Sequence, residues 1–410
     1  MNIFFYIIIG SLLFEFCLRT ISKYLDLKHI SSSIPSSFKN YYNADKYNKA
    51  QKYFKENAQF SYLTSAFDII LIFIIILSGL FNNLDLLIRS WEFSPIINGL
   101  LFFLILFIIQ DFINTPFSLY STFIIEEKYG FNKINLKTFI LDKIKGYFLL
   151  IIIGGGILSL ILFFFEKFDN WAWLYAWFGL SIFMVILQPL YTMFIAPMFN
   201  KFTPLKDGDL KEAINALSEK IKFPISNIDV MDGSKRSTKS NAYFSGIGKT
   251  KRIALFDTLI EQHTNDELLS ILAHEVGHYK LKHNIKGMVL GIFQTGVMFY
   301  LLSLFLNNNE LFSVFKMDNV SNYAGLLFFS LLYSPINLFL SFISYAISRK
   351  HEFEADAFAK KVIGTEKYLV EGLKKLTVSN LGNLYPHKLT VLLNYSHPPI
   401  LQRIDALNQK

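Results

Sequence analysis

Two histidines with a glutamate between them are the strongest chemical signal in this chain. His274 and His278 are four residues apart, and Glu275 follows the first of them. On a helix, side chains four apart lie about 40° apart around the axis, so both imidazoles can reach one Zn²⁺ ion. Glu275 would then lie beside the metal, where it could take a proton from a bound water whose pKa zinc lowers to roughly 7. The spacing predicts a hydrolytic zinc site.

The residues around this motif favour a helix. Thr264 and Glu267 have the spacing of a capping box, and an apolar stripe follows them. A coincidental match on an ordinary amphipathic helix remains the alternative. We expect His263 to be an exposed loop residue, because it precedes the cap. His283 lies nine residues after His274, so on the same helix it would face the opposite side.

Composition indicates the environment of the site. The chain has 410 residues, of which 52% are hydrophobic and 17% aromatic, too apolar for one soluble domain. We predict an α-helical integral membrane protein, because seven segments are long and apolar enough to cross about 30 Å of hydrocarbon. These segments are residues 2–18, 61–83, 97–115, 146–165, 172–195, 285–306 and 323–347.

The basic residues predict the orientation of the spans. Eight lysines and arginines lie between residues 19 and 55, whereas Arg89 is alone in the next loop, and this alternation continues along the chain. By the positive-inside rule the N-terminus is outside or lumenal and the C-terminus is cytoplasmic. The net charge of +8 then reflects the orientation of the spans in the membrane, and we expect no nucleic-acid partner. We interpret the first apolar run as a retained span, with a cleaved signal peptide as the alternative.

The predicted topology indicates where a third metal ligand lies. Spans six and seven form a hairpin, so the chain returns near residue 348 to the face that carries the histidines. There Glu352 and Asp356 share one helix face at spacing four, whereas Glu354 is turned about 200° from Glu352. We assign Glu352 to the metal and Asp356 to a hydrogen bond with a ligand imidazole. A solvated, charged helix end is the alternative. Cys17 is the only cysteine, so cysteine cannot supply the ligand set.

Residues 200–262 form a soluble segment before the metal helix. Its β-prone runs are residues 228–231, 241–244 and 252–256, separated by Gly, Ser and Lys. This pattern predicts a small antiparallel meander. An exposed strand could hold an extended substrate by backbone pairing, and a purely structural strand is equally compatible with the sequence.

The motifs together resemble the type I CAAX prenyl protease family of membrane zinc metallopeptidases. The resemblance rests on residues 274–278 and 352–359. It extends to residues 126–132, 195–205, 240–244, 252–259 and 395–399, in the family's order and over nearly the whole chain. Tyr129 is a small departure, because many members have His there. The long polar insertion that some eukaryotic members carry between spans six and seven is absent.

The resemblance implies a barrel of seven helices around a large water-filled chamber, closed at its cytoplasmic end by the zinc domain. Polar residues within or near the spans support a wet interior, although each could instead make an interhelical hydrogen bond. These residues are Glu15, Asp68, Gln110, Asp111, Asn114, Gln188, Gln294 and Asn337.

The resemblance also implies further site residues. Asn241, Ala242 and Tyr243 would form the substrate-binding strand edge. His397 would stabilise the oxyanion, and Arg403 would support the metal shell or the carboxylates. Asp356 would orient the site or share the proton-donor work.

We therefore expect a zinc metalloendopeptidase with one Zn²⁺ per chain, acting on extended peptides or proteins in contact with the lipid bilayer, and monomeric. Its domains would be residues 1–195 (spans one to five), 196–284 (β-meander and metal helix), 285–347 (spans six and seven) and 348–410 (a cytoplasmic tail that completes the site).

The substrate would be a prenylated Cys-a-a-X protein that loses its C-terminal tripeptide, or a membrane protein under quality control. The location would be a bacterial inner membrane or the endoplasmic reticulum. The alternatives are a site-2-type intramembrane zinc protease and a non-enzymatic transporter.

Overall fold

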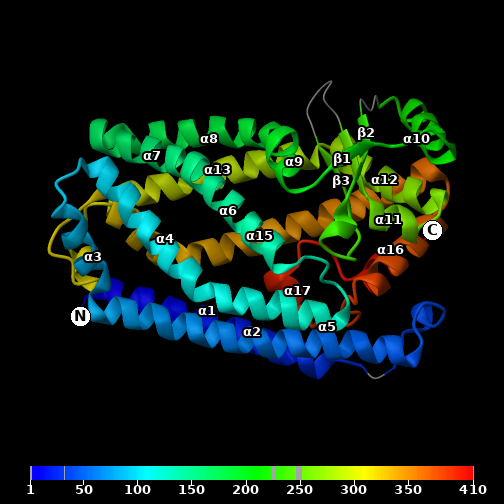
Figure 1. Ribbon diagram of the computed structural model, residues 1–410, viewed down its shortest axis with the longest axis horizontal. Helices are drawn as coiled ribbons and strands as arrows, with labels where there is room; N and C mark the ends of the chain where they lie inside the picture. The colour runs from blue at the N-terminus through cyan, green and yellow to red at the C-terminus, as the bar shows by residue number, and fades with distance from the viewer. Residues whose placement is uncertain (1, 32, 224–226, 246–251, 410) are drawn as a thin grey trace.

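The computed structural model describes residues 2–31, 33–223, 227–245 and 252–409, and it is mostly helical (Figure 1). Seven of the described helical segments are long and apolar enough to cross a membrane. They extend over Ile3–His29, Ala44–Ser78, Pro95–Tyr129, Leu136–Lys167, Asp169–Phe199, His283–Phe305 and Asn322–Ile363. Each contains most of one predicted apolar segment, and the largest difference is in the second, where the helix ends at Ser78 and not at residue 83. The predicted number and order of spans are therefore confirmed.

The first half of the chain supplies five of these spans. Three of them are α-helices continued through one π-helical turn, at Ser121–Glu126, Leu150–Gly154 and Tyr191–Ile195. The helices of this half are α1 (Ile3–His29), α2 (Ala44–Ser78), α3 (Leu80–Arg89), α4 (Pro95–Tyr120), α5 (Glu127–Tyr129), α6 (Leu136–Leu149), α7 (Gly155–Lys167), α8 (Ala172–Leu190) and α9 (Ala196–Phe199).

The second half adds a small sheet, two spans and the helices around the site. Its strands are β1 (Phe202–Pro204), β2 (Asn227–Met231), β3 (Ala242–Ser245) and β4 (Arg252–Phe256). Its helices are α10 (Asp209–Lys220), α11 (Asp257–Gln262), α12 (Asn265–Lys280), α13 (His283–Phe305), α14 (Asn309–Val314), α15 (Asn322–Ile363), α16 (Lys367–Ser379), α17 (Lys388–Asn394) and α18 (Ile400–Asn408).

The sheet is mixed, so the predicted antiparallel meander is wrong. Its strand order is β1-β2-β4-β3, and β2 and β4 pair in parallel, with Ile228 opposite Ile253. β1 and β3 pair antiparallel to their neighbours. The chain leaves β2, passes to the far side of β4 and forms β3 there, so β4 is inserted between two strands that precede it. The three predicted strand segments are present, and β3 forms one edge of the sheet.

The start of α12 has the predicted cap. The Thr264 side chain accepts from the backbone N–H of Glu267, and the Glu267 carboxylate accepts from the N–H of Thr264. The end of the helix lies before span six, so α12 and α13 are separate helices. α12 ends at Lys280, and Lys282 adopts a left-handed conformation with φ of 60° before α13 begins at His283. This turn breaks the helical hydrogen-bond ladder between the motif and the membrane.

α15 carries the last span and the second half of the site on one helix. It has 42 residues, so it is about 63 Å long. It packs against α12 along a face of small residues (Figure 1). A Cβ on Gly277 of α12 would lie 3.3 Å from both the Cα and the carbonyl oxygen of Ala355. Ala355 and Ala359 are fully buried at this crossing. The absence of a side chain at Gly277 therefore sets how closely the two helices approach.

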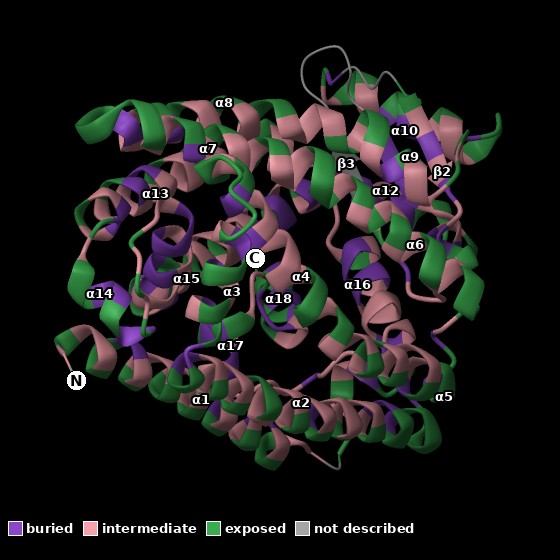
Figure 2. Ribbon diagram, turned by 60° about the vertical axis from the view of Figure 1, so that its left-hand side comes forward, coloured by how far each residue is buried: buried purple, intermediate pink, exposed green. Residues whose placement is uncertain are grey.

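Among the described residues, the buried side chains form three clusters. One cluster surrounds the sheet, α12 and α16, with Leu255, Leu272 and Leu369 among its members. A second lies where α3 and α14 meet the ends of the spans that are far from the sheet, around Phe81 and Phe328. Between them, α1 and α2 present mainly exposed or half-buried residues (Figure 2). A third cluster packs α13 against α8 and α15 within the spans, around Phe299 and Phe329.

Some polar residues of the spans line a cavity and others bond to a neighbouring helix, which are the two alternatives that the sequence left open. Glu15, Asp68 and Gln110 line a cavity of about 440 Å³ between α1, α2 and α4. Asp111 instead pairs with Lys143 of α6 at 2.6 Å, and Gln294 donates to the Ser344 hydroxyl at 3.1 Å. Some of these groups therefore line a cavity and others link helices. The single large chamber stays a prediction.

Substituting Gly277 with valine should force α12 and α15 apart. We expect a loss of about 1–3 kcal/mol in the free energy of unfolding, because the new side chain meets backbone atoms that cannot rotate away. Thermal unfolding in detergent measures the effect, and Gly287→Val in α13 is the control, because a Cβ there meets no atom within 4 Å. Equal melting temperatures for Gly277→Val and the unsubstituted chain would contradict the proposed role of this glycine.

Candidate metal and catalytic centre

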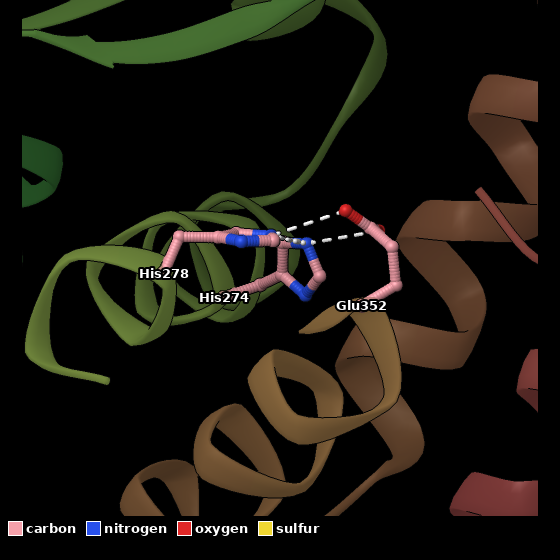
Figure 3. A group of neighbouring side chains, drawn as sticks. All are labelled: His274, His278 and Glu352. Atoms are coloured by element: carbon pink, nitrogen blue, oxygen red, sulfur yellow. Dashed lines mark hydrogen bonds and ion pairs between the residues drawn. The ribbon is translucent and has the colours of Figure 1, made fainter. Parts of the chain in front are cut away.

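The structure brings the three predicted metal ligands together (Figure 3). His274 and His278 project from α12, and Glu352 reaches them from α15. The two Nε2 atoms are 3.1 Å apart. The Glu352 oxygens lie 3.2 Å from Nε2 of His278 and 3.5 Å from Nε2 of His274. One atom from each residue therefore points to a common position, at the proximity that the helical spacing and the hairpin topology predict.

The chemistry of this cluster fits a metal ion. Two imidazoles and one carboxylate are a donor set found in catalytic zinc sites, where a fourth position stays open for water and substrate. Glu352 is buried with 4% of its surface exposed, and its Oε2 atom has no hydrogen-bond partner. A buried carboxylate oxygen without a hydrogen bond is costly unless a cation compensates it. The Arg403 guanidinium, 3.3 Å from this oxygen, supplies one cation, and the position between the three ligand atoms can hold a second.

Asp356 lies where the predicted hydrogen bond requires it. Its Oδ1 atom is 2.9 Å from Nδ1 of His274, so it accepts the Nδ1–H and leaves the Nε2 lone pair for a metal. Burial by itself lowers the pKa of His274, but the hydrogen bonds to Asp356 and Glu352 outweigh it and raise that pKa to about 9. A metal that binds Nε2 therefore replaces a proton that His274 otherwise holds near neutral pH.

Arg403 connects the C-terminal tail to both carboxylates. It lies on α18 and donates from Nε and Nη2 to the two oxygens of Asp356, at 2.8 and 2.6 Å. Its Nη1 is 3.3 Å from Glu352 Oε2. Arg403 and Asp356 are 7% and 2% exposed, so this bidentate pair is almost dry. The pair compensates charge that would otherwise be costly to bury.

His397 lies at the exposed side of the ligand cluster. Its Nε2 is 3.4 Å from Glu352 Oε1, and its side chain is 65% exposed. Arg349 donates to the carbonyl oxygens of Val391 and Tyr395, which fixes the segment that leads to His397. An imidazole N–H in this position can reach a carbonyl oxygen bound beside the metal ligands.

Glu275 adjoins the cluster on α12. Burial raises the pKa of its carboxyl group, whereas His274 and His278 lower it. A carboxylate with a raised pKa is suited to taking a proton and returning it.

The predicted substrate edge lies beside the metal helix, because β3 contacts α12. Asn241 is exposed, its carbonyl oxygen accepts from the N–H of Phe256, and its side-chain oxygen accepts from the N–H of Ala242. Tyr243 pairs through its backbone with Ala254, and its side chain lies outside the described residues. β3 is therefore an edge strand at the expected place, and substrate binding there stays a prediction.

Two histidines differ from the expectation. His263 is not an exposed loop residue, because only 7% of its surface is exposed and its ring nitrogens lie 3.0 and 3.2 Å from the carbonyl oxygens of Leu259 and Gly372. It joins α11 to α16, and no local pattern marked that contact. His283 is not on the helix of His274, and the turn at Lys282 returns its ring to 3.1 Å from His278. Sequence reasoning missed this contact because it assumed a continuous helix.

Comparison with known proteins identifies the family. Residues 204–410 match peptidase family M48. The chain belongs to peptidase family M48. Residues 23–201 match the family described as CAAX prenyl protease N-terminal, five membrane helices. The chain is therefore an integral membrane peptidase, as the resemblance implied. Family membership favours neither the site-2-type protease nor the transporter.

Two relatives and one solved structure are similar to this chain over nearly its whole length. A CAAX prenyl protease 1 homolog from Arabidopsis thaliana is 36% identical over 397 residues, which cover 94% of this chain and 93% of the relative. CAAX prenyl protease 1 of Saccharomyces cerevisiae is 32% identical over 98% of this chain and 94% of its own. The crystal structure of S. mikatae Ste24p superposes with a TM-score of 0.92 at 31% identity, covering 100% of this chain and 99% of that one.

Replacing Arg403 with methionine should destabilise the site, because it leaves the buried Asp356 carboxylate without its cation. We expect a loss of about 3–5 kcal/mol in the free energy of unfolding, measured by denaturant titration in detergent. The double variant Arg403→Met with Asp356→Leu should recover part of this loss, since no unpaired charge is then buried. A single variant as stable as the unsubstituted chain would show that the pair is not needed.

Proposed function

We propose that this member of the M48 family is a zinc-dependent endopeptidase that cleaves extended peptides at the α12–α15 crossing. The observation that carries the proposal is the convergence of His274 Nε2, His278 Nε2 and the Glu352 carboxylate, with the ligand atoms within 4.8 Å of one another. When bound, Zn²⁺ would lower the pKa of a coordinated water and polarise the scissile carbonyl. One ion per chain accounts for this ligand set.

The remaining residues divide the work of proton and charge transfer. Glu275 takes the proton of the attacking water and returns it to the leaving amine. His397 donates from its ring to the oxygen on which negative charge develops. Asp356 keeps His274 in the required tautomer, and Arg403 holds Asp356. Asn241, Ala242 and the Tyr243 backbone hold the substrate as an added strand on β3.

For the substrate, we propose a prenylated protein that ends in Cys-a-a-X and loses its last three residues. The support is that relatives named CAAX prenyl protease 1 are similar to this chain over more than nine-tenths of each chain. The alternation of basic residues supports a cytoplasmic site with the N-terminus on the other side of the membrane. We propose that the chain acts as a monomer, because every site residue comes from one chain. Degradation of misfolded membrane proteins is the second candidate, favoured by the cavity between α1, α2 and α4.

Glu275→Gln should abolish turnover and leave the metal in place. The amide keeps the size of the side chain but cannot take a proton, so we expect a fall in kcat of roughly 10²–10⁴. Elemental analysis should still find about one equivalent of zinc, because Glu275 is not a ligand. Wild-type cleavage by this variant would remove Glu275 from the mechanism. A zinc-free wild-type protein with full activity would overturn the whole proposal.

His397→Gln should lower kcat by roughly 10²–10³ with little change in KM, because the ring acts on charge that develops during the reaction. His29→Gln, which changes an exposed histidine in α1, is the matched control. Paired quenched peptides, one carrying a prenylated cysteine and one carrying a free cysteine, give the rates. Equal rates for the two peptides would favour the quality-control substrate.

A further inference from the structure

A second group of ionisable side chains adjoins the metal ligands and has no part in the mechanism above. His283 begins α13, and His351 and Glu354 lie on α15 on either side of Glu352. One potential ligand atom from each of the three lies within 4.8 Å of the others. His283 is 4% exposed, so its contacts are made out of water.

The geometry of this group argues against a second metal site. The rings of His283 and His351 stack with centroids 4.0 Å apart and planes inclined by only 6°. An imidazole binds a metal through a lone pair that lies in the plane of its ring. Two stacked, nearly parallel planes share no point close to both rings, so one ion cannot bind both histidines in this arrangement. The stack instead restrains the orientation of the His283 ring.

The nitrogens of His283 connect Glu354 to a metal ligand. Nε2 lies 2.9 Å from Glu354 Oε2, and Nδ1 lies 3.1 Å from Nδ1 of His278. An ionised carboxylate only accepts hydrogen bonds, so it places the proton of neutral His283 on Nε2. Nδ1 of His283 is then an acceptor and takes the Nδ1–H of His278. That tautomer leaves Nε2 of His278, which faces His274 and Glu352, free to bind a metal.

We propose that His283 is a positioning residue that fixes the tautomer and ring orientation of His278, and that Glu354 fixes those of His283. Each ligand histidine then has its own Nδ1 partner. Asp356, held by Arg403, serves His274, and His283, held by Glu354, serves His278. This inference rests on the proposed function only in taking His278 as a zinc ligand. The left-handed residue Lys282 makes the contact possible, because it turns the chain so that His283 faces back toward α12.

Zinc affinity of the full-length protein in detergent tests the proposal without any substrate. Competition with a chromophoric chelator measures the dissociation constant of zinc. We expect His283→Leu to weaken binding by roughly 10–100-fold, the usual effect of losing a partner of a ligand histidine. His283→Asn should stay within a few-fold of wild type, because its amide oxygen can occupy the place of Nδ1 and accept from His278. His351→Phe is the matched control. It keeps a stacked ring and removes none of the hydrogen bonds in the relay from Glu354 through His283 to His278.

Glu354→Leu keeps the test decisive if His283→Leu does not fold. Glu354 has a side chain that is 37% exposed, so its replacement should be tolerated, and zinc binding should again weaken. Wild-type affinity in His283→Leu or Glu354→Leu would overturn the relay. The relay would also be overturned if His351→Phe weakened zinc binding as much as His283→Leu does, or if the wild-type chain bound two zinc ions. Either result indicates a second metal site. Absence of zinc from the wild-type protein would instead overturn the proposed function, and the relay with it.

Discussion

The close contact between α12 and α15 is the constraint on which the site depends. Two of the three ligands lie on one helix and the third on the other, so the distance between the helix axes sets the distance between ligand atoms. Gly277 lies inside the histidine motif and faces the backbone of Ala355. A residue with a side chain at this position would push Glu352 away from the imidazoles. The motif therefore supplies two ligands, and its glycine leaves the space that lets Glu352 approach them.

Charge compensation explains why the C-terminal tail returns to this crossing. Glu352 and Asp356 are both buried, and two uncompensated carboxylates in the same dry volume would be costly. Arg403 contributes one cation, and a divalent metal would contribute the rest. The segment before α18 also places His397 at the exposed side, so one return of the chain supplies a structural cation and a candidate catalytic group. Arg403 on α18 and His397 just before it therefore reach the site in the same return of the chain.

The spans act as supports for this end of the molecule. α13 and α15 enter the site directly from the membrane, and between the two ends of the spans α13 packs against α8 and α15. Polar residues between those ends either line a cavity, as Asp68 does, or link helices, as Asp111 does. Such groups are tolerated in a span when they face water or another polar group rather than lipid.

Much of this architecture could be predicted from local patterns. The seven spans follow from apolar length, the start of α12 from its capping box, and the approach of Glu352 to the histidines from helix periodicity combined with a hairpin of spans. Interactions that depend on a change of chain direction could not be predicted in this way. The turn at Lys282 leaves no clear local signal, since it involves no glycine or proline. The glycines between β2 and β4 are compatible with either a parallel or an antiparallel pairing, so they did not predict the parallel one.

The sequence by itself determined the ligand types, their helical spacing and the membrane setting, because each depends on residues close together in the chain. Only the tertiary structure decided which nitrogen of each imidazole faces the metal position, that Arg403 neutralises Asp356, and that His283 contacts His278. These features depend on contacts between segments distant in sequence or separated by an irregular turn, and side-chain hydrogen bonds form only when folding sets the distances between them.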